Sequence, residues 1–280
     1  MKNLNLKDSM IVALAGFVFA GIGCAKPPSG AVSASLVMTG SSQPTTIANY
    51  KKTNPLLQLL SPMAIAFAPP AMNDSTGAVV ALNKAWIVVK EVEFKMDEVA
   101  GAGESSSSEI KFGGPYFVDL LSSIPASFGS AEVPVGVYRR IKMKLEKDSA
   151  LPAGAPTQLA GKSIYFEGTV SGVQFSYAAA DGAEFKISGP GGVNLSETAN
   201  LVLGVKMADL FKMIKLSGIT ATTAISDANR VNTANPCPLI DTSAADLFTC
   251  FRKGLEKAGK FGNDRDNDGE IEVGEDEVQD

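Results

Sequence analysis

Acidic side chains recur near the end of the sequence at a spacing that suits a hard divalent cation. Asp264, Asp266 and Asp268 are followed at once by Gly269. Twelve-residue calcium loops take oxygen ligands from positions one, three, five, seven, nine and twelve, and they need glycine at position six for a sharp turn. Counted from Asp264, the later ligand positions hold Glu270 (through its backbone carbonyl), Glu272 and the bidentate Glu275. The spacing therefore predicts one EF-hand-like Ca²⁺ loop over residues 264–275.

The residues before this loop are typical of an entering helix. Ser243 suits the N-cap, and Asp246 suits the first turn, where an acid interacts well with the helix dipole. One face would carry Leu247, Phe248, Phe251, Leu255 and Ala258. We find no second loop, and the few residues after Glu275 are too short for an exit helix, so we expect affinity of about 10⁻⁴–10⁻³ M. A disordered acidic tail is the alternative interpretation.

Two cysteines close to this helix are candidates for a disulfide. Cys237 and Cys250 would close a ring of about 14 residues, which in the entropic account stabilises the fold by roughly 3 kcal/mol. Such a bond requires an oxidising compartment. It would connect the turn at Pro236 to the helix that leads to the loop. Two buried free thiols are the alternative.

The start of the chain resembles an export signal. Lys2 and Lys7 precede an apolar stretch over residues 10–22, which is short for a membrane span and suited to a signal peptide. The stretch ends in small residues before Cys24, which predicts lipidation of Cys24 as the mature N-terminus. The residue after this cysteine is Ala25 and not the Asp that commonly retains bacterial lipoproteins in the inner membrane. This favours the outer membrane, with the protein facing either the periplasm or the exterior. A simple secretory signal with an incidental cysteine is the alternative.

Composition excludes several classes of chemistry. Histidine is absent from the 280 residues, which removes Ser-His-Asp and Cys-His catalysis and histidine-bound metals. The net charge of −5 argues against a nucleic-acid partner. Nine acids and one arginine lie between Gly262 and Asp280, so the acidity is local. No paired acids suggest a hydrolase, and we expect no enzymatic activity.

Between the signal and the first clear strand the composition is that of a linker. Residues 25–50 are rich in Ser, Gly, Ala, Thr and Pro, which predicts a tether. A second apolar stretch over residues 55–68 is interrupted by Pro62 and followed by Pro69 and Pro70. It is therefore a poor spanning helix, and we expect it to pack on the domain.

The middle of the chain predicts many short strands. Residues 86–96 alternate, and we place Trp86, Val88, Lys90, Val92, Phe94 and Met96 on the core side. Further strands are expected at residues 116–121, 133–145, 163–170, 173–177, 184–188 and 201–205, separated by Gly/Pro segments such as residues 188–192. A short helix is expected over residues 207–214. The basic residues between Arg140 and Lys144 predict a solvated sheet face. This spacing favours an antiparallel β-sandwich or barrel.

Four segments together resemble the bacterial domain of unknown function 4382. They are KAWIVVKEVEF (84–94), GPYFVDLL (114–121), VPVGVYRRIKMKL (133–145) and NLVLGVKMADLF (200–211). The resemblance implies a transthyretin-like sandwich, often in a lipoprotein, and no catalytic residues. The fold class we expect is mainly β, a transthyretin- or immunoglobulin-like sandwich with a small C-terminal helix and calcium-type loop. The expected divisions are a signal (1–23), a tether with apolar lead-in (24–76), the sandwich (77–218) and a disulfide-linked helix and loop (219–280).

These observations favour a non-catalytic, lipid-anchored envelope protein that binds calcium through one loop. Its partners would be the membrane, through the N-terminal lipid, and an envelope protein or glycan. The alternative is an adhesin or a small-ligand- or glycan-binding sandwich in which calcium is only structural. Trp86 is a weak cue for that alternative, because a lone tryptophan is more often a core residue.

Overall fold

The strands of this computed structural model sort into two sheets. It describes residues 30–41, 72–96, 109–147, 150–180, 182–196, 199–264 and 277–279. The five-stranded sheet has the order β13-β12-β10-β1-β5, and the eight-stranded sheet has the order β11-β8-β7-β3-β6-β9, with β2 and β4 also paired to β3. The described part of the chain is therefore mainly β, as predicted.

The strands and helices have the following bounds. The five-stranded sheet contains β1 (Ala31–Ser41), β5 (Ala126–Pro134), β10 (Ala199–Lys206), β12 (Gly259–Asn263) and β13 (Glu277–Gln279). The eight-stranded sheet contains β2 (Met72–Asn73), β3 (Val79–Met96), β4 (Glu109–Asp119), β6 (Gly136–Leu145), β7 (Ile164–Val170), β8 (Val173–Ala179), β9 (Ala183–Leu195) and β11 (Thr223–Ser226). The helices are η2 (Thr157–Leu159), α3 (Met207–Lys212) and α4 (Leu247–Ala258).

Strand β1 corrects the tether that the sequence predicted. Residues 31–41 lie inside the five-stranded sheet, parallel to β10 on one side and antiparallel to β5 on the other. Ala34, Leu36 and Met38 are buried at 0–1% exposure. Since every second residue is apolar, the strand buries one face despite its small, linker-like residues. The short strand β2 likewise begins before the predicted start of the sandwich at residue 77.

The long strand β3 changes which of its side chains face the core. In the pairing with β6, Val89 lies opposite Leu145 and Glu91 opposite Lys144, so Lys90 is an extra residue. Such a bulge shifts the alternation by one residue. The inward side chains are Ala85, Ile87 and Val89 before the bulge and Val92 and Phe94 after it. The prediction for Val92 and Phe94 was right, whereas the placement of Trp86 on the core side was wrong.

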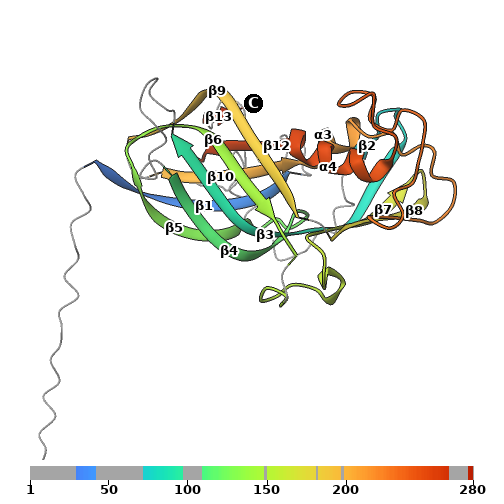
Figure 1. Ribbon diagram of the computed structural model, residues 1–280, viewed down its shortest axis with the longest axis horizontal. Coiled ribbons are helices and arrows are strands. Elements are labelled where there is room, and N and C mark those ends of the chain that lie inside the picture. Colours follow the sequence, from blue (N-terminus) through green and yellow to red (C-terminus); the bar gives the residue numbers. More distant parts are fainter. Residues whose placement is uncertain are drawn as a thin grey trace, which may run out of the picture.

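Two different layers cover the inner face of the eight-stranded sheet. Near the end of β3 the five-stranded sheet packs on it, and Phe94 meets Phe261 of β12 with ring centroids 5.3 Å apart. Over β7 and β8 the cover is α3 and α4, and Phe251 of α4 stacks on Tyr177 at 4.4 Å. Figure 1 shows both helices at the end of the molecule where β7 and β8 lie. Burying each ring stabilises the fold by roughly 1.5–3 kcal/mol.

Three other features differ from the sequence predictions. The pairs β1–β10 and β8–β11 are parallel, so the sheets are not wholly antiparallel. Strand β9 runs through residues 188–192, where the Gly/Pro segment forms an irregularity opposite Tyr138 and Arg140 instead of ending the strand. Strand β10 pairs with both β1 and β12, so one sheet joins the predicted tether, sandwich and C-terminal divisions.

Candidate functional site

The predicted calcium loop is closed by paired strands. Asn263 of β12 lies opposite Glu277 of β13, and this pairing holds the two ends of the intervening segment together. Asp264, the first predicted ligand, is 5% exposed. Its backbone N–H donates to the carbonyl oxygen of Asn200 over 2.7 Å. The other predicted ligands, Asp266, Asp268, Glu270, Glu272 and Glu275, lie outside the described residues.

A strand leads into this loop where the sequence predicted a helix. Helix α4 ends at Ala258, and β12 follows directly, paired with β10. The glycines at positions 259 and 262 disfavour continued helix, and Phe261 gains a buried place opposite Leu203 by extending. The predicted entering helix is therefore separated from the loop by one strand.

The N-cap of α4 also lies three residues later than predicted. Asp246 is the N-cap, and its Oδ1 accepts a hydrogen bond from the Thr249 N–H at 2.7 Å. Burial by itself raises the pKa of Asp246, but the bonds from Thr249 and Arg230 outweigh this effect and lower it. Ser243, the predicted cap, instead donates its backbone N–H to Asp241. The charged cap suits the positive end of the helix dipole.

The cysteine pair near α4 forms the predicted disulfide. Cys237 and Cys250 are bonded, with Cα atoms 5.5 Å apart, and both are fully buried. The bond connects the turn after Pro236 to the first half of α4. Its burial protects it from reductants in solvent and gives it a structural place in the fold. Cys24, the predicted lipidation site, lies outside the described residues.

Within the described ranges we find neither a metal-ligand cluster nor a membrane-spanning helix. No three acidic or sulfur side chains come together as a metal-ligand group there. The helices of those ranges are also too short or too polar to cross a membrane.

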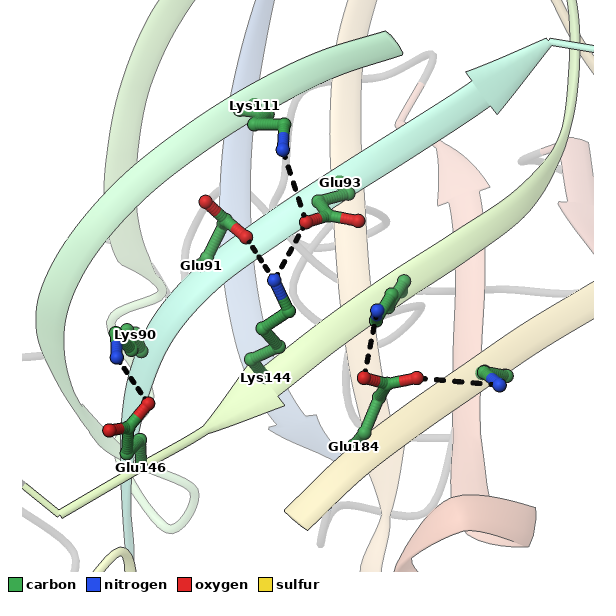
Figure 2. A network of polar contacts seen from close by, with 9 residues as sticks. Lys90, Glu91, Glu93, Lys111, Lys144, Glu146 and Glu184 are labelled. Atoms are coloured by element: carbon green, nitrogen blue, oxygen red, sulfur yellow. Dashed lines mark hydrogen bonds and ion pairs between the residues drawn. The ribbon is translucent and has the colours of Figure 1, made fainter. Parts of the chain in front are cut away.

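The basic alternation of β6 is neutralised by glutamates on neighbouring strands. Lys144 Nζ lies 2.6 Å from Glu91 and 2.8 Å from Glu93, both on β3. Glu93 is only 4% exposed at its side chain and also pairs with Lys111 of β4 at 3.4 Å. Figure 2 shows this lattice together with the Lys90–Glu146 pair. These ion pairs favour the predicted interpretation of a solvated sheet face over an anion-binding surface.

The same pattern continues to β9. Glu184 accepts from Lys142 at 2.8 Å and from Lys186 at 3.4 Å. Hydrogen bonding to Lys142 is the main cause that lowers the pKa of Glu184. Hydrogen bonds to Glu91 and Glu93 raise the pKa of Lys144. Because exposed pairs contribute only about 0–1 kcal/mol each, the two pairs of Glu184 align the strands more than they add stability.

Sequence reasoning missed a group of aromatic rings on the outer face of the eight-stranded sheet. Trp86 of β3 stacks on Tyr165 of β7, with ring centroids 5.7 Å apart and an interplanar angle of 27°. Phe117 of β4 meets Trp86 edge-on at 6.5 Å. We call Phe117, Trp86 and Tyr165 the aromatic row. The sequence does contain a second apolar alternation in this strand, Ala85, Ile87 and Val89. Only the bulge at Lys90 decides whether this set or the set that contains Trp86 faces the core.

A hollow of about 290 Å³ lies between α4 and β9. Its lining includes the acids Glu184 and Glu256 and the bases Arg252 and Lys253. Glu184 is paired with Lys142, and Lys253 is paired with Asp241. The opposite charges balance, so the hollow has no converging set of groups that would select one ligand.

The comparisons with known proteins give no relative. No protein family, no curated protein and no solved structure matches this chain.

Proposed function

We propose that this chain is a non-catalytic, lipid-anchored protein of the bacterial envelope that binds one calcium ion through residues 264–275. The fold that accompanies this proposal is a transthyretin-like sandwich, as the sequence resemblance implies. Calcium would neutralise part of the local negative charge and order the last residues of the chain. The membrane partner would be reached through a lipid on Cys24.

The pairing of β12 with β13 is the observation that most supports the proposal. A calcium loop must return on itself so that positions one and twelve reach the same ion. The pair Asn263–Glu277 lies just outside these positions and brings the two ends of the segment together. Asp264 at position one is held by its backbone bond to Asn200. Asp, Glu and carbonyl oxygens are the ligands that calcium prefers.

Calorimetric titration of the full chain with CaCl₂ tests the proposal. We expect one site with a Kd of about 10⁻⁴–10⁻³ M, as for other extracellular modules. Glu275→Gln removes one oxygen of the bidentate ligand and should abolish the heat. Glu256→Gln, on the exposed face of α4, is the matched control and should bind as the unmodified chain does. Absence of heat from the unmodified chain at 10 mM CaCl₂, roughly tenfold above the weak end of that range, would end the proposal.

The lipid anchor has a separate test. Expressed in a bacterium with a lipoprotein pathway, the chain should incorporate labelled palmitate and sediment with membranes. Cys24→Ser should lose both properties, while Cys237→Ser should keep the label because it lies in the folded region. Label retained in Cys24→Ser would rule out this cysteine as the anchor.

A further inference from the structure

The aromatic row lies on the outer face of the eight-stranded sheet, outside the main hydrophobic core. Trp86 and Tyr165 are partners in the β3–β7 register, and both alternate with core residues on their strands. All three rings of the row are half-buried, whereas the core rings Phe94, Phe166 and Tyr177 are 0% exposed. Three neighbouring strands therefore present apolar ring surface to solvent across the sheet.

Polar groups surround these rings and are already organised. Glu167 Oε2 accepts from Tyr165 Oη at 2.7 Å and from Lys84 Nζ at 3.1 Å. Lys84 Nζ also lies 5.5 Å from the centre of the Trp86 ring. Asp119 of β4 is the register partner of Trp86 on its other side. The row thus has donors and an acceptor on its β7 side and an acceptor, Asp119, on its β4 side.

The protonation states of these groups are fixed near neutral pH. Burial first, and then the bond to Glu167, raise the pKa of Tyr165 to about 12. The bonds from Tyr165 and Lys84 lower the pKa of Glu167. Tyr165 therefore remains a donor and Glu167 an acceptor at neutral pH.

The charges in the row's surroundings cancel. Lys84 and Lys162 supply two positive charges, and Asp119 and Glu167 supply two negative charges. A strongly charged ligand would find no net attraction here. Apolar ring surfaces with a few placed polar groups instead match a ligand that is uncharged, flat on one side and rich in hydroxyls.

We propose that the aromatic row binds neutral pyranose units of a polysaccharide. The C–H face of a sugar ring packs against Trp86 and its neighbours, while sugar hydroxyls donate to Glu167 and Asp119 and accept from Lys84. Lys84 is 29% exposed at its side chain, so it can turn from the Trp86 ring toward a hydroxyl. Calcium plays no part in this site, which stands or falls separately from the proposed calcium loop.

Tryptophan fluorescence can test whether the aromatic row binds a sugar. Trp86 is the only tryptophan in the chain, so its emission reports the row alone. The full chain in mild detergent is titrated with maltohexaose, cellohexaose and chitohexaose, and then applied to a broad glycan array. We expect a saturable shift of emission to shorter wavelength with at least one neutral glycan, unchanged by excess chelator.

Variants then locate the binding. Tyr165→Ala and Phe117→Ala keep the reporter and should weaken binding at least tenfold, while Tyr165→Phe should weaken it less because the ring remains. Lys186→Ala, on β9 of the same sheet and 70% exposed, is the matched control and should bind normally. Circular dichroism confirms that each variant is folded.

Three results would overturn the proposal. The first is silence of both the titrations and the array. The second is equal loss of binding in Lys186→Ala, which would place the sugar elsewhere. The third is an emission shift with phosphatidylcholine vesicles and none with any glycan, which would make the row a membrane contact.

Discussion

Asp74 illustrates how one buried carboxylate connects distant segments. Its Oδ1 accepts from Thr76 and from the Ala78 N–H, closing the turn between β2 and β3. Its Oδ2 accepts from the N–H groups of Leu216 at 2.8 Å and Ser217 at 2.9 Å. The residue is 3% exposed. These bonds hold the segment after α3 against the turn that precedes the longest strand.

Replacing Asp74 should destabilise the protein severely. Asp74→Ala removes the carboxylate that accepts from four backbone N–H groups, of which that of Leu216 is buried. A hydrogen bond to a charged group contributes about 1.5–3 kcal/mol, and a buried N–H without an acceptor costs about 1–3 kcal/mol. We expect a loss of about 3 kcal/mol or more in the free energy of unfolding, measured with urea. Asp209→Ala is the control, because this carboxylate is about half exposed and its ion pair with Lys212 is long, at 4.0 Å. Similar losses in the two variants would contradict this account.

The charge of Asp74 also predicts a dependence of stability on pH. Burial alone raises the pKa of Asp74, but the bonds from Thr76, Ala78 and Leu216 outweigh it and hold the pKa below the ordinary 3.8. Because the folded state lowers this pKa, the carboxylate's contribution is complete above pH 3.8 and is lost as the pH falls through the folded value. The difference in unfolding free energy between the unmodified chain and Asp74→Asn should therefore be constant from pH 7 to 5 and shrink below pH 3.8. A gap that stays constant down to pH 2, well below that pKa, would exclude the carboxylate as its source.

Among the strands, the close packing of β1 against Leu120 gives a direct prediction for stability. A Cβ on Gly40 would lie 2.0 Å from the backbone oxygen of Leu120, which cannot move aside as a side chain can. We expect Gly40→Ala to lower the free energy of unfolding by about 1–3 kcal/mol or more through overpacking. Gly113→Ala on β4 is the matched control, because a Cβ there meets nothing within 4 Å. If residues 31–41 were a tether, Gly40→Ala would behave like the control.

Strands with strict alternation could be predicted from the sequence, whereas features set by distant partners could not. Residues Ile164–Val170 alternate cleanly between buried and half-buried, and the prediction of a strand there was confirmed. The segment Met207–Lys212 is likewise the short helix that was predicted. Strand β1 was missed because small residues suit both a linker and a strand, and its partner β10 is far along the chain.

Among the candidate sites, too, those set by local sequence could be predicted and those set by distant strand partners could not. The Cys237–Cys250 bond was predictable because both residues and their helix are local in sequence. The aromatic row was not, since Trp86 faces outward only because Lys90 bulges against β6. The strand before the calcium loop was also missed, because Phe261 extends to reach Leu203, and that pairing is invisible in local periodicity.

The whole molecule depends on β10, whose two neighbours come from opposite ends of the chain. Strand β1 pairs on one side and β12 on the other. Helix α4 fills the space over β7 and β8, where Phe251 lies 6.2 Å from Phe166 and 6.0 Å from Phe211. Neither sheet nor core can therefore be completed without residues after 218.

We accordingly predict that the chain unfolds as one cooperative unit. Scanning calorimetry should show a single transition whose calorimetric and van't Hoff enthalpies agree. A chain ending at residue 218 lacks α4 and β12 and exposes Phe166, Phe175 and Tyr177, so it should show neither native near-ultraviolet dichroism nor a thermal transition. A chain ending at residue 264 keeps both elements and should retain the transition at slightly lower temperature. In that chain β12 loses only its pairing with β13. Loss of the thermal transition in the chain ending at 264, or native-like dichroism in the chain ending at 218, would contradict this view.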